Sequence, residues 1–453
     1  MKIKILIVGF VYGAALYKSL GTFCSLCKKQ RRNEEKMNQK LFSKDFILVI
    51  IGQIISLFGN ATIRFVLPLY LLNQTGSSVI YGNVTACAFI PAILLSPVGG
   101  ILADRVNKRN VMVILDFFTA ISIFVFSLLF LHVNLILVLT IMLMLLYSIA
   151  GIYQPSVQAS IPVLVSQSNY MAANSIVNVI NSFATLIGPI FGGILYSTYG
   201  LKCVLWVCMV CFILSAIMEI FIKITFVKQD SNSGICRMAI KDFSESIRFI
   251  RKEKSVIGKV LLVVCGINLF LSAMIMVGMP YIITEVLNLG ELQVNKLLGY
   301  AEGMLAAGGL IGGICTGIFA NKLVIKRAGT LIIACALFVF PMGVSLLLFS
   351  SGFINYLVMI LCGFMIMIFS TVFAVQMLSF VQVETPQHLI GKVMSVVLTI
   401  SMCAQPLGNA LYGILFEYCK GVEWIVILFA GFISLIIAIR AKNLFIKISL
   451  KEK

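Results

Sequence analysis

A short charged stretch between two long apolar runs constrains the fold of this chain more than any other feature. Residues 99–110 read GGILADRVNKRN, and the apolar run of about 20 residues on each side is long enough to cross a bilayer as a helix. Gly100 lets the two helices approach closely, and Asp104 places a carboxylate at the membrane edge. Arg105 and Arg109 favour the cytoplasmic side. The stretch is therefore predicted to be a tight cytoplasmic turn.

The composition is that of a protein that crosses the membrane many times. Of the 453 residues, 60% are hydrophobic, and the mean hydropathy is +1.06. The net charge of +18 does not indicate a nucleic-acid partner, because all but four of the 35 Lys and Arg lie in segments on one side of the predicted spans. The exceptions are Lys202, Lys296, Lys420 and Arg64. This asymmetry predicts a protein of the cytoplasmic membrane with both termini in the cytoplasm.

Metal, cofactor and enzyme chemistry are not indicated. The 13 cysteines are scattered, and Cys24 and Cys27 form a single CxxC pair without the second pair that a structural zinc site needs. No GxxxxGKS/T phosphate-binding string occurs in the chain, and no nucleophile–base pair stands out. We therefore expect no metal site, no cofactor and no enzymatic activity.

Twelve apolar runs predict an all-α integral membrane protein with two pseudo-symmetric bundles of six helices. The expected spans are 46–72, 80–103, 111–131, 135–158, 172–196, 204–222, 256–283, 297–320, 329–349, 356–381, 391–418 and 424–441. An N-terminal bundle (37–222) and a C-terminal bundle with a basic tail (256–453) flank a cytoplasmic linker (223–255).

The linker has the pattern of an amphipathic helix. Ile240, Phe243, Ile247 and Ile250 share one helical face, and basic side chains surround that face. This pattern predicts a helix that lies on the inner leaflet and connects the two bundles.

Residues 1–36 precede the predicted bundle and do not fit into it. Their apolar run is short for a span and resembles the apolar core of a signal peptide, without a small-residue cleavage site. An unused upstream extension, a loose interfacial segment and an extra helix are all compatible with this pattern. Because twelve spans are complete without it, we expect the extension to be non-essential and a chain that starts at Met37 to insert normally.

The second half of the chain repeats the first. A shift of 217 residues places Gly100 on another glycine and Pro189 on Pro406. The same shift places Asp104 on Asn321, so the second copy has lost the acidic charge. One offset that aligns both a turn and a distant proline supports two parallel halves of six helices.

The turn and two further segments resemble a known family. The order Gly-x-Leu-Ala-Asp-Arg followed by a base resembles the loop 2–3 signature of the major facilitator superfamily, with matches at Gly100, Leu102, Ala103, Asp104, Arg105 and Arg109. The first span, and residues 153–175 with their two prolines, resemble the macrolide-efflux and enterobactin-exporter-like branch.

The resemblance implies a secondary transporter that exports small amphipathic molecules by alternating access, driven by proton antiport. Its expected partners are a small-molecule substrate, protons and the lipid bilayer, and the expected assembly is a monomer. A lipid or siderophore exporter and a non-transporting membrane sensor are the alternatives. The GPxxGG string at Gly188, Pro189, Gly192 and Gly193 resembles an antiporter signature and is expected to bend and thin its helix.

Two residues of the first span are candidates for the substrate pathway. Asn60 and Arg64 are four residues apart and therefore share one helical face. A charge inside a span is costly unless it faces a cavity or a partner, so Arg64 either contacts substrate or an acid, or extends toward the outer interface. Asn60 either lines the cavity or forms a hydrogen bond between helices.

Three acids inside or near spans complete the candidate list. Glu302 lies between Tyr300 and a glycine-rich face, and a carboxylic acid in a low-dielectric span favours its neutral form. It is therefore expected either to take up and release protons or to be an acid close to the outer interface. Asp116 follows Arg109 by two helical turns and is expected to join the charge network of the turn. Glu219 is expected to be a solvated charge at a helix end.

Overall fold

The computed structural model describes residues 43–165, 170–223, 235–318, 325–386 and 389–451. The N-terminal extension, the first part of the linker and Asn321 lie outside the described residues. Eleven helical stretches in the described part of the chain are long and apolar enough to cross a membrane. The longest of them covers 45 residues, enough for two crossings at about 20 residues each. The predicted all-α fold with twelve spans is therefore confirmed.

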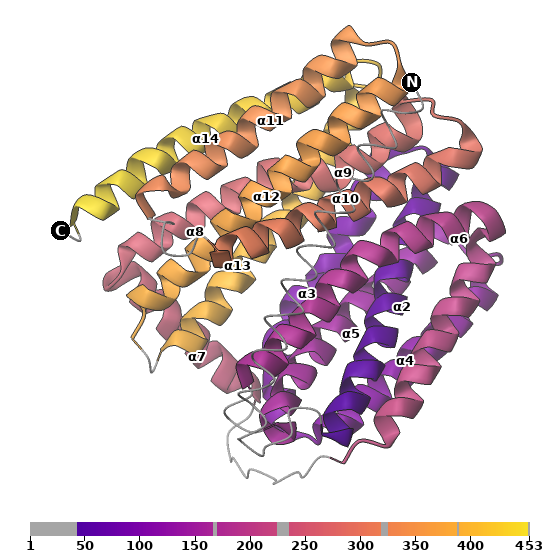
Figure 1. The fold of residues 1–453 in the computed structure, drawn as a ribbon, viewed down its shortest axis with the longest axis vertical. Helices are drawn as coiled ribbons and strands as arrows, with labels where there is room; N and C mark the ends of the chain where they lie inside the picture. Colours follow the sequence, from indigo (N-terminus) through magenta and orange to yellow (C-terminus); the bar gives the residue numbers. More distant parts are fainter. Residues whose placement is uncertain (1–42, 166–169, 224–234, 319–324, 387–388, 452–453) are drawn as a thin grey trace, which may run out of the picture.

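The N-terminal bundle contains five helices, α2 to α6 (Figure 1). Their bounds are α2 Lys44–Thr75, α3 Ser78–Arg105, α4 Lys108–Leu129, α5 Leu135–Leu164 and α6 Tyr170–Ile220. In α6 the backbone of Gly200 takes φ 75° and ψ 178°, a conformation suited to glycine, and this break divides α6 into the predicted fifth and sixth spans.

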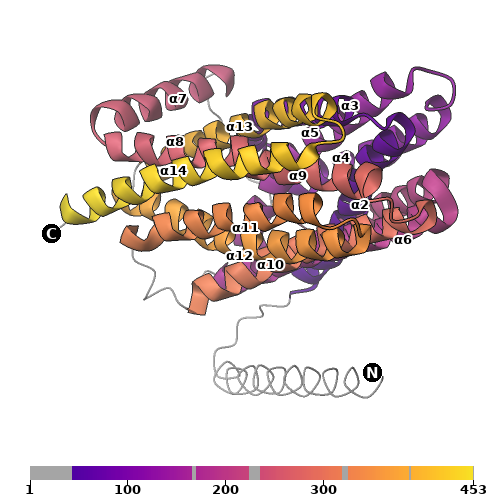
Figure 2. The same cartoon turned by 90° about the horizontal axis from the view of Figure 1, so that it is seen from above.

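The C-terminal bundle lies beside the first in both views (Figures 1 and 2). Its seventh span is α8 Ser255–Ile267, a π-helical turn Asn268–Ser272, α9 Ala273–Tyr281 and a second π-helical turn Ile282–Val286. The others are α10 Glu291–Ile318, α11 Ala328–Leu348, α12 Gly352–Glu384, α13 Ile390–Tyr418 and α14 Glu423–Lys451, with a short 3₁₀ helix, Ile325–Arg327, before α11. The π-helical turns have no counterpart in the sequence prediction.

The predicted turn of residues 99–110 is much shorter in the structure. Helix α3 continues to Arg105 and α4 begins at Lys108, so only Val106 and Asn107 connect them. The Asn107 side chain accepts a hydrogen bond from the Arg109 backbone amide at 3.1 Å and so caps α4. Most of the charged stretch is therefore helical, because a capping residue directly follows the last turn of α3.

Helix α7, Ile235–Lys252, forms within the linker and packs on the C-terminal bundle. Phe249 and Ile250 are buried with Ile257 of α8 and Val393 of α13, whereas Phe243 is 44% exposed. Beside them, the Lys392 ammonium donates to the Glu245 carboxylate at 2.9 Å. The final turns of the predicted amphipathic face thus cover protein, whereas Phe243 is available to contact lipid.

The helix connections lie at two opposite ends of the molecule. The basic end contains α7 and the α3–α4 connection with its flanking turns, which are rich in Lys and Arg. The far end contains the α2–α3 connection and the last turn of α13. Between these ends, the long helices of the two bundles lie side by side (Figure 1). Helix α3 packs on α13, and α6 packs on α10.

Candidate functional site

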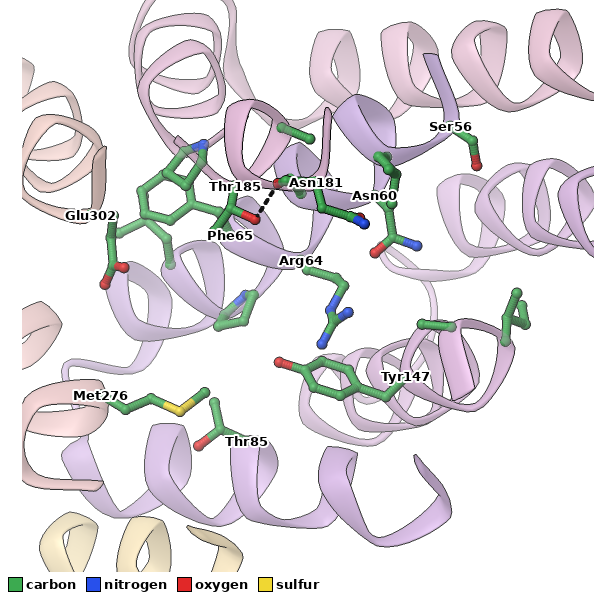
Figure 3. Close-up of a pocket in the computed structure, with 18 of the residues that line it drawn as sticks. Ser56, Asn60, Arg64, Phe65, Thr85, Tyr147, Asn181, Thr185, Met276 and Glu302 are labelled. Atoms are coloured by element: carbon green, nitrogen blue, oxygen red, sulfur yellow. Dashed lines mark hydrogen bonds between the residues drawn. The ribbon is translucent and has the colours of Figure 1, made fainter. Parts of the chain in front are cut away.

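A cavity of about 540 Å³ lies between the two bundles. Helices α2, α3, α5 and α6 line it from the N-terminal half, and α9 and α10 line it from the C-terminal half (Figure 3). Its polar lining residues are Ser56, Asn60, Arg64, Tyr81, Thr85, Tyr147, Tyr153, Gln154, Asn181, Thr185 and Glu302. The other lining residues are mainly apolar, including Phe65, Ile149 and Met276. The lining thus combines apolar surface with many polar groups, as a pocket for an amphipathic ligand requires.

One face of α2 supplies the centre of the site. Ser56, Asn60 and Arg64 recur every four residues, so all three line the cavity. Helix α2 begins with Ser43, whose hydroxyl accepts from the Phe46 amide at 3.2 Å, and ends at Gly76 with φ 58°. The structure thus places both α2 residues predicted from the sequence in the cavity.

Arg64 points across the cavity toward α5 (Figure 3). Its guanidinium carbon lies 3.5 Å from the centre of the Tyr147 ring, a cation–π contact. Of the alternatives open from the sequence, the structure favours a cavity-facing charge over one that extends to the outer interface. The contact holds the planar cation in place while leaving its N–H groups available for a ligand.

Glu302 faces the cavity from α10, on the opposite wall from Arg64 (Figure 3). Leu298, one turn earlier on α10, and Tyr81 of α3 also line the cavity. The ion pairs found among the described residues include neither Glu302 nor Arg64. The cavity therefore presents one cation and one acid across a largely apolar space.

The far end of the cavity is closed by contacts between the bundles. The Asn73 amide donates to the side-chain oxygen of Asn295 at 2.8 Å, and the Ser77 hydroxyl donates to the Glu417 carboxylate at 3.0 Å. Nearer the cavity, the Tyr81 hydroxyl donates to the Met276 carbonyl at 3.5 Å. The hydrogen bonds described between the two bundles lie toward this end, so the structure is held closed there.

Two glycine crossings bring the bundles into backbone contact. A Cβ atom on Gly82 would lie 2.5 Å from the Asn409 carbonyl oxygen and 2.9 Å from the Gly413 Cα. A Cβ atom on Gly193 would lie 2.6 Å from the Asn295 carbonyl oxygen. Neither position has room for a side chain, so α3 packs directly on α13 and α6 packs directly on α10.

The GPxxGG string of α6 packs on α2 as well as lining the cavity. A Cβ atom on Gly188 would lie 2.5 Å from the Ala61 Cβ, and one on Gly192 would lie 3.0 Å from a Val66 methyl group. Pro189 lies inside the helix and lines the cavity. The string therefore thins α6 where it passes between two neighbouring helices.

Pro406 lies inside α13. The glycine contacts between the bundles show that it is not the exact structural equivalent of Pro189. Gly413 crosses α3 in the way that Gly193 crosses α10, and these two glycines are 220 positions apart. The two prolines are 217 apart, so Pro406 lies about one helical turn from the structural equivalent of Pro189. The offset of 217 residues therefore slips by three residues in this helix.

The turn residues are described only in part. Gly100, Asp104 and Arg105 lie in the last turns of α3, and their side-chain contacts are outside the described residues. Arg109 lies in the first turn of α4 with a buried Nε atom that has no hydrogen-bond partner. The gating role of these residues stays a prediction.

Two acids are buried inside the N-terminal bundle. Glu219 is 1% exposed, so the prediction of a solvated helix end was wrong. Asp116 is also 1% exposed, and its hydrogen-bond partner is the Ser56 hydroxyl of α2, at 3.0 Å. Tyr153 of α5 donates to the Glu219 carboxylate at 2.6 Å. A contact between residues this far apart in sequence leaves no periodic pattern, so sequence reasoning missed it.

No group of three or more His, Cys, Asp or Glu side chains that could hold a metal ion is found among the described residues.

Comparison with known proteins gives one family and several relatives. A family model described as Major Facilitator Superfamily matches residues 49–409. Macrolide efflux protein A of Streptococcus pyogenes is 24% identical over 399 residues, covering 87% of this chain and 94% of that protein. Multidrug efflux pump Tap of Mycolicibacterium fortuitum is 21% identical, covering 81% and 88%.

Among solved structures, a point mutant of the nucleoside transporter NupG has a similar fold. Its TM-score is 0.69 at 14% identity, with 88% of this chain and 99% of that chain covered.

Proposed function

Because the chain belongs to the Major Facilitator Superfamily, a family of membrane transporters, we propose that it exports small amphipathic molecules across the cytoplasmic membrane in exchange for protons. The observation that carries the proposal is the cavity between the bundles, with Arg64 and Glu302 on opposite walls. Alternating access would come from one bundle rocking against the other around this cavity. Each chain contains a complete cavity, so the proposed working unit is a monomer.

The cavity fits an amphipathic substrate. Its volume of about 540 Å³ lies within the range of about 300–1,000 Å³ usual for drug-sized ligands. Phe65, Tyr147 and Met276 offer apolar and aromatic surface, while Asn60 offers a hydrogen-bonding amide. The relatives named for macrolide and multidrug efflux support macrolide-like molecules as the substrate class.

The direction of transport follows from the proposed orientation. The basic end faces the cytoplasm by the positive-inside rule, and the far end is the closed one. This conformation would load substrate from the cytoplasm. Asp104 is proposed to stabilise the alternative, inward-closed conformation through the amide end of α13. The linker, which includes α7, would connect the two bundles while each bundle moves as a rigid unit.

Glu302 is proposed to couple the proton to the substrate. A carboxylic acid in a largely apolar cavity favours its neutral form and ionises when water or a cationic ligand group reaches it. Its position across from Arg64 lets an arriving substrate compete with the proton for the same space. Binding of the proton and binding of the substrate would then exclude each other, so that each is released on its own side of the membrane in turn.

The test separates coupling from binding. Glu302→Gln preserves size and polarity, so it should retain macrolide binding and counterflow exchange but lose uptake driven by a pH gradient in everted membrane vesicles. If exchange and driven uptake fell equally, Glu302 would be a binding or packing residue. If the wild-type protein supported neither activity with any ligand, the chain would be a sensor rather than a transporter.

A further inference from the structure

We infer that Asp116 and Glu219 form a proton-binding site inside the N-terminal bundle, and that this site reaches the cavity through Ser56 and Tyr153. The inference deepens the proposed function and rests on it only for the role of the site in transport. Proton binding itself is open to a test that requires no substrate.

The two acids are brought together by tertiary packing. Asp116 comes from α4 and Glu219 comes from α6, two helices that pack against each other, and the two carboxyl groups lie close enough for their charges to interact. Each side chain is 1% exposed. Two ionised carboxylates at such a place would repel each other and lack solvation, so at least one proton or another cation must compensate them.

The hydrogen bonds of the cluster show what is missing. Ser56 donates to Asp116 Oδ1 at 3.0 Å, and Tyr153 donates to Glu219 Oε1 at 2.6 Å. Gln53, which is fully buried, donates its amide N–H to the Tyr153 oxygen at 2.7 Å.

Three buried acceptors in the cluster have no donor: Asp116 Oδ2, Glu219 Oε2 and Gln53 Oε1. The cluster is therefore short of donors, not of acceptors. A proton on either carboxyl group removes one acceptor that lacks a partner and supplies one O–H donor for another acceptor.

The charged groups around the cluster do not supply the missing donors. On α4, Arg109 lies two turns before Asp116, and the ion pairs of the described residues do not include it. On α2, Asp45 accepts from the backbone amide of Lys223, whose own side chain is exposed. On α5, Tyr153 is the titratable group that faces the acids, and it already donates to Glu219. No third acid, His or Cys joins the pair within the described residues, which favours a proton over a divalent metal.

Two members of the cluster also belong to the cavity wall. Ser56 and Tyr153 both line the cavity while their hydroxyl groups contact the two acids. A hydroxyl group both donates and accepts, so each can pass a proton between cavity water and a buried carboxylate. Ser56 shares its helical face with Asn60 and Arg64, and a change of charge at Asp116 is thereby felt on the wall that contacts substrate.

The direct test is infrared spectroscopy of the purified full-length protein during a pH titration. Protonated, buried carboxylic acids give carbonyl bands apart from those of ionised carboxylates. We expect Asp116→Asn and Glu219→Gln each to remove or shift such a band, and the double variant to remove every band that belongs to the pair. Glu253→Gln, which changes an exposed acid outside the bundle, should leave the spectrum unchanged.

Two further measurements keep the inference falsifiable. Tyr153→Phe removes one hydroxyl donor without changing any charge in the core. It should shift only the band assigned to Glu219. Spectra that are identical in wild type and both acid variants would overturn the inference, and bands that respond to sodium ions but not to pH would replace the proton with sodium.

Transport of a radiolabelled macrolide in vesicles separates this site from the proposed function. Loss of pH-driven uptake by at least tenfold in Asp116→Asn and Glu219→Gln, with exchange retained, would support the site as part of coupling. Titrating bands in a protein that moves no macrolide would support the site and refute the proposed function. Unchanged bands together with unchanged pH-driven uptake would refute the site alone.

Discussion

Substitution of Gly82 by alanine should open the far end of the molecule. The added Cβ atom would lie 2.5 Å from the Asn409 carbonyl oxygen and 2.9 Å from the Gly413 Cα, and both are backbone atoms that no rotamer change can move. Helices α3 and α13 must therefore separate at this crossing. Overpacking of this kind costs about 1–3 kcal/mol.

The cost applies to the far-end-closed conformation alone. Alanine also favours a helix over glycine by about 1 kcal/mol, but the residue is helical in both conformations, so that gain cancels in the equilibrium between them. A cost of about 1–3 kcal/mol corresponds to a shift of about 5- to 140-fold toward the conformation with the far end open.

The assay is a distance measurement between spin labels at Leu131 and Tyr418, two exposed positions at the far end of the two bundles. Labels on unnatural amino acids avoid the 13 native cysteines. Gly82→Ala should raise the population at the longer distance. The matched control is Gly313→Ala in α10, where an added Cβ atom meets nothing within 4 Å. Equal distance distributions for Gly82→Ala and the wild type would refute the reasoning.

Three further predictions test separate parts of the structure. Arg64→Gln removes the guanidinium whose N–H groups are proposed to contact substrate, and should weaken macrolide binding severalfold in a fluorescence titration. Tyr147→Phe retains the ring that holds Arg64 at 3.5 Å by a contact worth about 0.5–2 kcal/mol, and should change binding little. Asp104→Asn should reduce transport in vesicles without lowering the amount of protein in the membrane, and unchanged rates would argue against its gating role. Phe249→Ala should lower the free energy of unfolding by about 3–5 kcal/mol, because this side chain is 3% exposed. Phe243→Ala, at 44% exposure, should leave thermal stability in detergent nearly unchanged. Equal effects of the two substitutions would mean that α7 does not dock as described.

Local patterns in the sequence were sufficient to predict the spans. A helix that crosses a bilayer needs a long apolar run, and such runs are visible without any tertiary information. Asn107, which follows the charged end of α3, is also a local signal, and a closer reading of it as a helix cap would have placed the turn at two residues. Gly200, between the fifth and sixth spans, is a second local signal, because glycine readily takes the positive φ that the backbone has there.

Contacts between distant segments were beyond the sequence. Arg64 and Glu302 were selected because a charge in lipid is costly, and the structure places both in the cavity. Tyr147 had no such signal, because an aromatic residue in a span is ordinary. The pairing of Asp116 with Glu219 depends on how α4 packs against α6, which no periodicity encodes.

The most direct test of proton-coupled export uses the purified protein in liposomes with no other energy source. With an acidic interior and a neutral exterior, molecules whose basic end faces outward should accumulate a radiolabelled macrolide inside as protons leave. That accumulation should exceed the passive accumulation in empty liposomes, and an ionophore that collapses the pH gradient should abolish it. Accumulation that is no greater than in empty liposomes, or that persists after the gradient has collapsed, would contradict the account.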